Sequence, residues 1–424
     1  MKAAFYTLGC KVNHYETEAM TELFRQADWE IVDFSAQADV YVVNTCTVTQ
    51  ISDKKSRQML SRAHAEAPDA LIVAVGCYAQ SASETVEKLP GVGLVLGTDG
   101  RREIVERVEE ALHGRTGSRV TDIRQTHAFE ELTPHRDGRT RATLKIQDGC
   151  RNYCTYCIIP YARGPIRSRS MENIEQELHT LARDGYREVV LTGIHLASYG
   201  LDTGKGELLD VMQLADSIDG IDRVRLGSLE PRYVDAHFCE VAAALPSLCR
   251  QFHLSLQSGS DSVLLRMSRR YTTEEYKKSV ALLRQYMPDC AITTDVIAGF
   301  VGETEQEHNE TLAFVEKIGF SRIHVFPYSR RKGTKADAMP GHLEKRVKDA
   351  RAKELIALGE RLELAFAQKQ LGTTAEVLLE TDGTGYTKNY VRVRALGHEG
   401  DVVRVLLTDI GTDGILTGKE LERI

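Results

Sequence analysis

The 424-residue sequence lacks three features that would each assign it to a broad class of protein. No charged and then apolar leader opens the chain, and no apolar run approaches the length that spans a membrane, so we expect a cytoplasmic protein. An excess of basic residues is also absent, because 54 Lys and Arg stand against 61 Asp and Glu, a net charge of −7. Any contact with nucleic acid must therefore come from a local basic patch.

The cysteines are not expected to form disulfides, and the histidines form no metal-binding pairs. Nine cysteines in a cytoplasmic chain indicate metal ligands, catalytic thiols or small buried residues. Cys239, Cys249 and Cys290 fit no metal-binding spacing, so we expect them in the core or on the surface. The histidines, His195 and His253 included, form no ligand pair and receive no role. The length favours two or three domains.

Three other cysteines lie close together after a strand-like run. Cys150, Cys154 and Cys157 follow residues 142–147, with three and then two residues between the thiols. Thiolates are soft ligands that suit zinc, copper or iron–sulfur clusters. Three ligands are one fewer than a closed zinc site or an ordinary cluster needs, so one iron of a four-iron cluster would stay open to a small molecule. A zinc loop completed by a distant Cys or His is the alternative.

Cys10, Cys46 and Cys77 each end a short apolar run that is followed by a helical pattern. Alternating strands and helices favour βαβ units and a parallel sheet, which places all three thiols at the carboxyl ends of strands. Open α/β sheets bind ligands along that edge, so the pattern predicts a second three-thiolate site. Three separate structural cysteines, or one catalytic thiol, are the alternatives. The predicted helices here are residues 14–27, 53–67 and 82–89.

From residue 142 onward, six strands alternate with helices, which suits an open, partial barrel. Barrels carry their chemistry at the carboxyl ends of strands, where this chain has Gly193, Ser228, Glu230 and Gln257. The predicted strands are near 142–147, 187–192, 223–229, 252–257, 291–297 and 321–327. The predicted helices are near 171–185, 206–219, 233–245, 261–287, 304–319 and 343–370, with capping boxes at Thr272 with Glu275 and at Thr304 with Glu307.

The ends of this central region differ from it in composition. Residues 114–141 are mostly polar and are interpreted as a connection between domains. From residue 371 the pattern changes to short strands near 374–380, 387–395 and 401–409, separated by glycine-containing turns. Such a segment favours a small β-barrel.

Two basic stretches are candidates for contact with nucleic acid. Lys388, Tyr390, Arg392 and Arg394 alternate along the second strand of the tail, so the pattern predicts cations and an aromatic ring on one strand face. Such a face suits phosphates and a stacked base, although a solvated strand face is the alternative. The charged loop 329–335 follows the last barrel strand and is either an RNA phosphate contact or simply solvated.

The octet Cys150-Arg151-Asn152-Tyr153-Cys154-Thr155-Tyr156-Cys157 resembles the signature of the radical S-adenosylmethionine (SAM) enzymes. The longer stretch 147–164 resembles the methylthiotransferase branch of that superfamily, and so do residues 7–13, 44–49 and 76–77. The resemblance implies that the open iron binds SAM and that SAM is cleaved to a 5′-deoxyadenosyl radical. It implies an α/β fold whose core is an open (βα)6 barrel.

The same resemblance implies roles for the residues identified above. Cys150, Cys154 and Cys157 would hold the SAM-binding 4Fe-4S cluster, and Cys10, Cys46 and Cys77 an auxiliary 4Fe-4S cluster that carries or donates sulfur. One SAM would supply the radical and another the methyl group. Residues at the strand ends would bind SAM, with these candidates: Tyr156, Gly193, Ser228, Glu230 and Gln257. The implied domains are a methylthiotransferase amino-terminal domain (1–113), the connection (114–141), the radical SAM core (142–370) and a TRAM-like RNA-binding domain (371–424).

The motifs at residues 9–13 and 156–164 are most similar to the branch that modifies threonylcarbamoyladenosine in tRNA. The sister branches act on isopentenyladenosine in tRNA or on an aspartate of a ribosomal protein, and both stay alternatives. The expected partners are tRNA and an electron donor such as a flavodoxin or ferredoxin, while the sulfur source is open. A zinc-bearing RNA-binding protein without catalysis is the alternative from another class.

Overall fold

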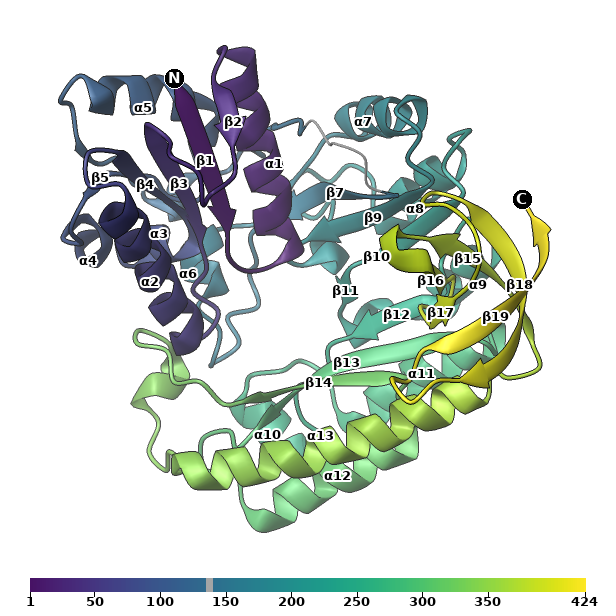
Figure 1. Ribbon diagram of the computed structural model, residues 1–424. Helices are drawn as coiled ribbons and strands as arrows, with labels where there is room; N and C mark the ends of the chain where they lie inside the picture. The colour runs from purple at the N-terminus through teal and green to yellow at the C-terminus, as the bar shows by residue number, and fades with distance from the viewer. Residues whose placement is uncertain (135–139) are drawn as a thin grey trace.

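The computed structural model describes residues 1–134 and 140–424. Residues 135–139, which belong to the expected connection, lie outside the described residues. Figure 1 shows an amino-terminal sheet with its helices, a central set of strands backed by helices, and a small barrel at the carboxyl end. The fold is thus α/β with a closed β-barrel at its end, as the sequence predicts.

The amino-terminal sheet is entirely parallel, in the order β2-β1-β3-β4-β5-β6. The three predicted strands are present, and β3 is buried along its whole length. The predicted helix 82–89 is wrong in extent, because the backbone leaves helical geometry at Ala82 between two short helices. The elements are β1 Lys2–Thr7, α1 Lys11–Gln26, β2 Glu30–Val32, β3 Val40–Thr45, α2 Gln50–Glu66, β4 Leu71–Gly76, α3 Cys77–Ser81, α4 Ser83–Glu87, β5 Val92–Val95, α5 Ile104–Leu112 and β6 Gly117–Ser118.

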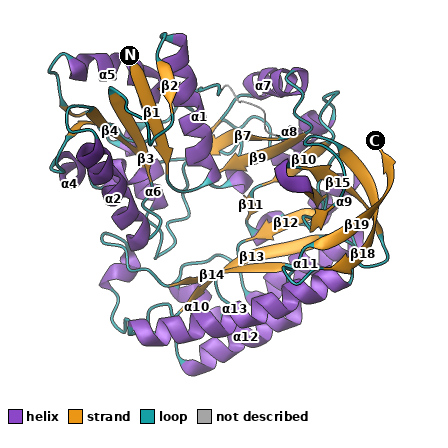
Figure 2. Cartoon of the chain, viewed as in Figure 1, coloured by secondary structure: helices purple, strands orange, loops and turns teal. Residues whose placement is uncertain are grey.

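The central strands form two parallel sets that follow one another around an open, curved sheet (Figure 2). One set runs β10-β9-β7 with the short antiparallel β8 at its edge, and the other runs β11-β12-β13-β14. The chain passes from the first set to the second at Gly227, so the predicted strand 223–229 is two strands. The strands are β7 Arg141–Asp148, β8 Arg167–Ser168, β9 Glu188–Gly193, β10 Arg223–Leu226, β11 Ser228–Leu229, β12 Gln251–Leu254, β13 Ala291–Ala298 and β14 Arg322–Pro327.

Helices cover the outer face of this sheet and bury its apolar side chains in one large core. Both predicted capping boxes are present, at Thr272 with Glu275 and at Thr304 with Glu307. The predicted helix 261–287 is two helices, because Ser268 adopts a positive φ of 56° and the Thr272 cap starts a new helix. The helices are α6 Ile159–Arg163, α7 Met171–Arg183, α8 Leu208–Asp216, α9 Ala236–Ala244, α10 Asp261–Arg266, α11 Thr273–Tyr286, α12 Glu305–Ile318 and α13 Lys345–Gln368.

The carboxyl-terminal strands close into a barrel in the order β15-β16-β17-β19-β18. The last strand, β19, was not predicted, because its apolar residues are few and most of its side chains are exposed. The predicted strand 387–395 is wrong, since a turn at residues 388–391 divides it and Tyr390 has a φ of 67°. The strands are β15 Thr374–Leu379, β16 Thr384–Thr387, β17 Arg392–Arg394, β18 Val402–Ile410 and β19 Leu416–Arg423.

That turn changes where the four predicted RNA-binding side chains point. The ring of Tyr390 lies under the guanidinium of Arg225 on β10, 4.4 Å from the ring centroid, and Lys388 donates to the carbonyl of Pro246 at 2.9 Å. Arg392 and Arg394 remain about half exposed. The expectation of one shared basic face is therefore wrong: Lys388 and Tyr390 attach the small barrel to the central strands.

A buried carboxylate at this junction gives the fold a predictable response to acid. Glu188 is fully buried, and its oxygens lie 2.6 Å from Arg141 and 2.8 Å from Arg225. Burial raises the pKa of this carboxyl, but the guanidinium groups of Arg225 and Arg141 outweigh burial and lower it from 4.5 to about 2. The stability that Glu188 contributes is complete above pH 4.5 and is lost as the pH falls through about 2.

We therefore expect Glu188→Gln to be less stable than the wild type at pH 7 and to show a smaller loss between pH 4.5 and pH 2. The wild type should lose about 3 kcal/mol more than the variant over this range. Thermal unfolding at a series of pH values measures the difference. Glu274→Gln, at an exposed carboxylate paired with Lys277, is the control and should leave the acid response unchanged. Parallel acid responses of wild type and Glu188→Gln would contradict the prediction.

Candidate functional site

The first cysteine loop leaves the carboxyl end of β7, the position that the sequence predicts. Backbone bonds from Cys150 to the Gly164 carbonyl (3.1 Å) and from Thr155 to the Met267 carbonyl (3.0 Å) hold it. Burial, with a smaller contribution from the neighbouring thiols, raises the pKa of Cys150 to about 11 and that of Cys157 to about 12. Buried thiolates are therefore unfavourable here unless a metal compensates their charge, which is the property of an iron–sulfur ligand set.

Polar side chains surround this loop and include several that the sequence analysis left unassigned. Asn152 in the loop lies 3.2 Å from Glu230 and 3.0 Å from His195, and His195 Nε2 lies 2.8 Å from Glu230. Burial raises the pKa of Glu230, but His195, Arg269 and Asn152 together outweigh burial and lower it to about 2, so this carboxylate is ionised at neutral pH. Arg269 lies 3.3 Å from Cys154 Sγ. The loop thus lies between an anionic group and a cationic one.

The other predicted SAM-binding residues lie on the same strand ends. Gly193 ends β9, and a Cβ there would come within 2.9 Å of Gln147, so a larger residue would not fit. Ser228 is exposed at the start of β11, and Gln257 has a φ of 69° beside β13. Tyr156 packs edge-on against Phe300, with ring centroids 6.4 Å apart. His195 also follows the end of β9, and this position is the sequence signal that identifies it as a further candidate for the SAM site.

The second group of thiols lies along the carboxyl edge of the amino-terminal sheet. Cys10, Cys46 and Cys77 follow β1, β3 and β4. Gly9, with a φ of 113°, lets the chain turn so closely that a Cβ would lie 3.1 Å from Cys46 Sγ. Burial, with smaller contributions from the other two thiols, raises the pKa of Cys77 to about 12, although the Arg163 guanidinium acts in the opposite direction. The predicted convergence of the three cysteines is therefore present in the folded chain.

No single-ion metal site is formed by either of the two described cysteine triads, Cys10, Cys46 and Cys77 or Cys150, Cys154 and Cys157. Within residues 1–134 and 140–424, no three His, Cys, Asp or Glu side chains are arranged to hold one metal ion. A four-iron cluster spreads its ligands over separate irons, so this finding bears on the zinc alternative and leaves the cluster alternative intact. Cys239, Cys249 and Cys290 are buried away from both triads, as expected.

The basic loop 329–335 packs against the amino-terminal sheet. Arg331 is buried and binds Asp53 at 2.7 Å and Thr47 at 2.5 Å, so neither alternative, a phosphate contact or a solvated side chain, is correct for this residue. The loop also lines a cavity of about 580 Å³ together with Tyr78 and Ile158. These two residues directly follow Cys77 and Cys157 in the chain, although no described cysteine lines the cavity.

Comparison with known proteins assigns the chain to a family. The model of the uncharacterized protein family UPF0004 matches residues 2–97, and the radical SAM superfamily model matches residues 144–315. A threonylcarbamoyladenosine tRNA methylthiotransferase, MtaB, of Bacillus subtilis is 41% identical over 96% of this chain and 94% of the relative. The protein of the same name in Aquifex aeolicus is 38% identical over 96% and 100%. The chain belongs to the radical SAM methylthiotransferases.

Other relatives mark the limits of the similarity. A tRNA-2-methylthio-N6-dimethylallyladenosine synthase of Pelotomaculum thermopropionicum is 33% identical over 91% of this chain and 88% of the relative. Among solved structures, the radical SAM methyltransferase TsrM of Kitasatospora setae aligns with a TM-score of 0.60 at 15% identity, over 79% of this chain and 76% of TsrM. That similarity concerns the fold alone.

Membership establishes the reaction class. This radical SAM methylthiotransferase is an enzyme of tRNA modification that uses 4Fe-4S chemistry and SAM. The donor sets fit these cofactors, because each triad offers three thiols and the first has an ionised carboxylate beside it. Five of the six thiols are buried or half-buried, and Cys10 is exposed. No described helix is both long enough and apolar enough to cross a membrane.

Proposed function

We propose that the protein methylthiolates N6-threonylcarbamoyladenosine next to the anticodon of tRNA, giving 2-methylthio-N6-threonylcarbamoyladenosine. The observation that carries this choice of nucleoside is the 41% identity to the Bacillus subtilis relative over 96% of the chain. Relatives named for dimethylallyladenosine are 32–33% identical. The acceptor is an aromatic C–H bond with no useful acidity, so acid–base side chains cannot activate it and a radical is needed.

In this proposal Cys150, Cys154 and Cys157 hold the SAM-binding cluster. Bound there, a 4Fe-4S cluster with an open iron supplies the electron that cleaves SAM. The chain's own residues bind and orient SAM: the Glu230 carboxylate attracts its cationic part, and His195 keeps that carboxylate ionised and in place. Gly193 lets Gln147 pack closely against the end of β9, where a Cβ would lie 2.9 Å from the Gln147 side chain. The other contacts are assigned to Tyr156, Ser228 and Gln257.

Cys10, Cys46 and Cys77 hold the auxiliary 4Fe-4S cluster, which provides the sulfur. Cys46 and Cys77 are buried, whereas Cys10 lies exposed at the edge of this site. We assign the entry of the substrate to the cavity lined by Tyr78 and Ile158, because each of these residues is next in sequence to a ligand cysteine. This placement suits a reaction in which one substrate atom must meet both centres.

RNA recognition is assigned to the last of three domains, with the boundaries 1–113, 142–370 and 371–424 and a connection at 114–141. Arg392 and Arg394 are its phosphate contacts, because both are about half exposed and need only exchange the carboxylates of Asp382 and Asp413 for phosphates. Lys388 and Tyr390 take no part in this assignment, because they bind the central strands. A one-electron donor of the flavodoxin or ferredoxin class reduces the first cluster.

Mass spectrometry of tRNA nucleosides from cells with and without the gene tests the proposed function. We expect complete loss of 2-methylthio-N6-threonylcarbamoyladenosine and accumulation of its unthiolated precursor, both restored by the wild-type gene. Complementation with a Cys154→Ala gene is the matched negative control. Loss of 2-methylthio-isopentenyladenosine instead would assign the chain to the sister branch, and unchanged tRNA would overturn the proposed function.

A further inference from the structure

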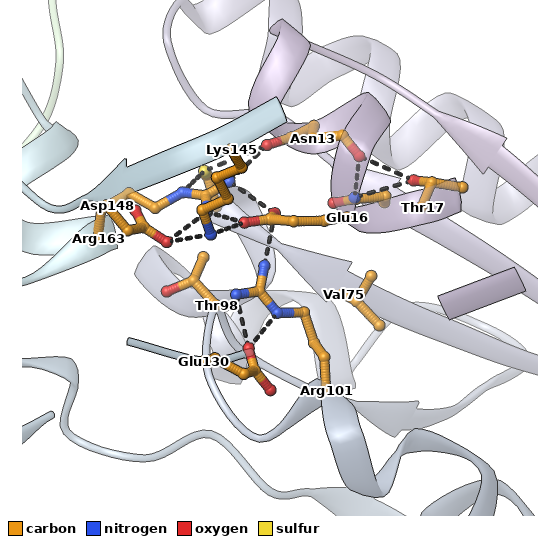
Figure 3. Close-up of polar contacts among 12 residues, drawn as sticks. Asn13, Glu16, Thr17, Val75, Thr98, Arg101, Glu130, Lys145, Asp148 and Arg163 are labelled. Atoms are coloured by element: carbon orange, nitrogen blue, oxygen red, sulfur yellow. Dashed lines mark hydrogen bonds and ion pairs between the residues drawn. The ribbon is translucent and has the colours of Figure 1, made fainter. Parts of the chain in front are cut away.

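The segment that follows the first triad ends at the second one. Helix α6 begins two residues after Cys157 and ends at Arg163, whose side chain has no exposed surface. Arg163 Nε donates to Cys77 Sγ at 3.2 Å, and Arg163 Nη2 donates to Asn13 Oδ1 at 2.6 Å. Its charge is paired with Glu16 on α1 (Figure 3). One guanidinium thus contacts a thiol of the second triad and the helix that follows Cys10.

Asn13 extends this contact to a second thiol. Its Oδ1 atom lies 3.9 Å from Cys10 Sγ and 4.0 Å from Cys77 Sγ. Its amide group donates to the carbonyls of Leu8 (2.8 Å) and Thr45 (3.1 Å), which fixes its orientation between the ends of β1 and β3. Arg163 therefore acts on a rigid edge, where small displacements of one group move its neighbours.

The charges around Arg163 are unequal. Among the described residues that these contacts join, the cations are Arg101, Lys145, Arg163 and Arg167, and the carboxylates are Glu16, Glu130 and Asp148. Four cations therefore face three carboxylates, and all but Glu130 are nearly or fully inaccessible to water. A buried cation needs a counter-ion, and the Cys77 sulfur is the anionic group within reach of Arg163 when it ligates iron.

We infer that Arg163 positions the auxiliary cluster and raises its reduction potential, through its hydrogen bond to Cys77 Sγ and its buried charge. Reduction adds negative charge to a cluster, and a donor and cation at a ligating sulfur stabilise the reduced form. This inference rests on the proposed assignment of Cys10, Cys46 and Cys77 to that cluster. It gives α6 a function: this one-turn helix fixes the distance from the loop of the first cluster to a ligand of the second.

A redox titration of the full-length protein, followed by electron paramagnetic resonance, tests the inference. The background carries Cys150→Ala, Cys154→Ala and Cys157→Ala, so only the auxiliary cluster is observed. We expect Arg163→Gln to shift its midpoint potential to a more negative value. Arg163→Lys, which keeps the charge and loses the paired donors, should shift it less in the same direction. Arg167→Gln is the matched control, because it removes a cation from the same network without a contact to a thiol.

The outcomes separate the inference from the assignment on which it rests. Background protein that holds about four irons, with a negative shift for Arg163→Gln that exceeds the shift for Arg167→Gln, supports both. Equal potentials for wild-type Arg163 and its variants, or an equal shift for Arg167→Gln, would overturn the inference while leaving the cluster in place. Background protein without iron would overturn the assignment. If Arg163→Gln fails to take up iron, the midpoint potential of Arg163→Lys is compared with that of Arg167→Gln, and the same outcomes apply.

Discussion

Replacing Cys10, Cys46 and Cys77 together with alanine is expected to abolish sulfur transfer to tRNA and to leave the reductive cleavage of SAM intact. The reason is spatial, since the other three thiols occupy a separate loop at the end of β7 and keep their own surroundings. Iron per chain should fall from about eight to about four, with sulfide falling in parallel. Anaerobic purification, iron and sulfide analysis, and chromatographic measurement of 5′-deoxyadenosine and modified nucleosides give the three readouts.

A matched control removes the same number of buried thiols from elsewhere in the chain. Cys239, Cys249 and Cys290 are all buried, and replacing them with alanine should leave iron, SAM cleavage and sulfur transfer unchanged. If 5′-deoxyadenosine formation vanished in the first variant while four irons remained, the roles of the two triads would be reversed. Stoichiometric zinc in colourless wild-type protein would favour the non-catalytic alternative.

The elements that the sequence predicts well are those with strong periodicity or a run of β-branched residues. Strand β3 begins with four apolar residues, three of them valine, and is buried throughout, so its sequence carries a strong strand signal. The strands β2 and β6 are only three and two residues long, too short for a pattern to form. Their places are fixed by pairing with β1 and β5, which no local sequence signal encodes.

The same distinction separates the predicted from the missed parts of the site. The thiols could be found because a cluster loop requires them at a fixed spacing, and because each amino-terminal cysteine ends a recognisable strand. Arg163 and Glu16 are 147 residues apart, and Arg331 meets Asp53 across 278. Such contacts depend on how the sheets pack, so a charged residue that is buried in the fold cannot be told from a solvated one in the sequence.

The contrast between Lys388 and Arg392 shows the same limit on a smaller scale. Alternation along an unbroken strand would place both side chains on one face. A turn with a positive φ at Tyr390 interrupts the strand, and side chains on the two sides of that turn then point differently. Non-glycine residues with positive φ are uncommon, so a sequence-based interpretation would not place one at a tyrosine.

Glu16 makes the second large prediction possible, because it is the central carboxylate of the buried network. It is fully buried on α1, 2.5 Å from Arg101 and 2.7 Å from Lys145, and is also paired with Arg163. Burial raises the pKa of Glu16, but the cations Arg101, Arg163 and Lys145 outweigh burial and hold the pKa far below its ordinary value. The carboxylate is therefore charged at every pH at which the protein would be assayed.

Glu16→Ala should lower the stability of the protein by about 3–5 kcal/mol, because it leaves three buried cations without their shared partner. Glu22→Ala, on the same helix and next to Arg25 at 3.9 Å, should change stability by less than about 0.5 kcal/mol. Denaturant unfolding of the iron-free proteins measures both without interference from the clusters.

The network around Glu16 also connects the parts of the fold that carry the two thiol triads. Glu16 lies on α1 together with Asn13, whereas Lys145, Asp148 and Arg163 come from β7 and α6, so the network joins the amino-terminal sheet to the central strands. Losing Glu16 should therefore loosen the contact that holds the two thiol triads at a fixed distance. If Glu16→Ala were as stable as Glu22→Ala, the three cations that pair with Glu16 would have found other partners. In that case it would also be wrong that the Cys77 sulfur balances a surplus of positive charge.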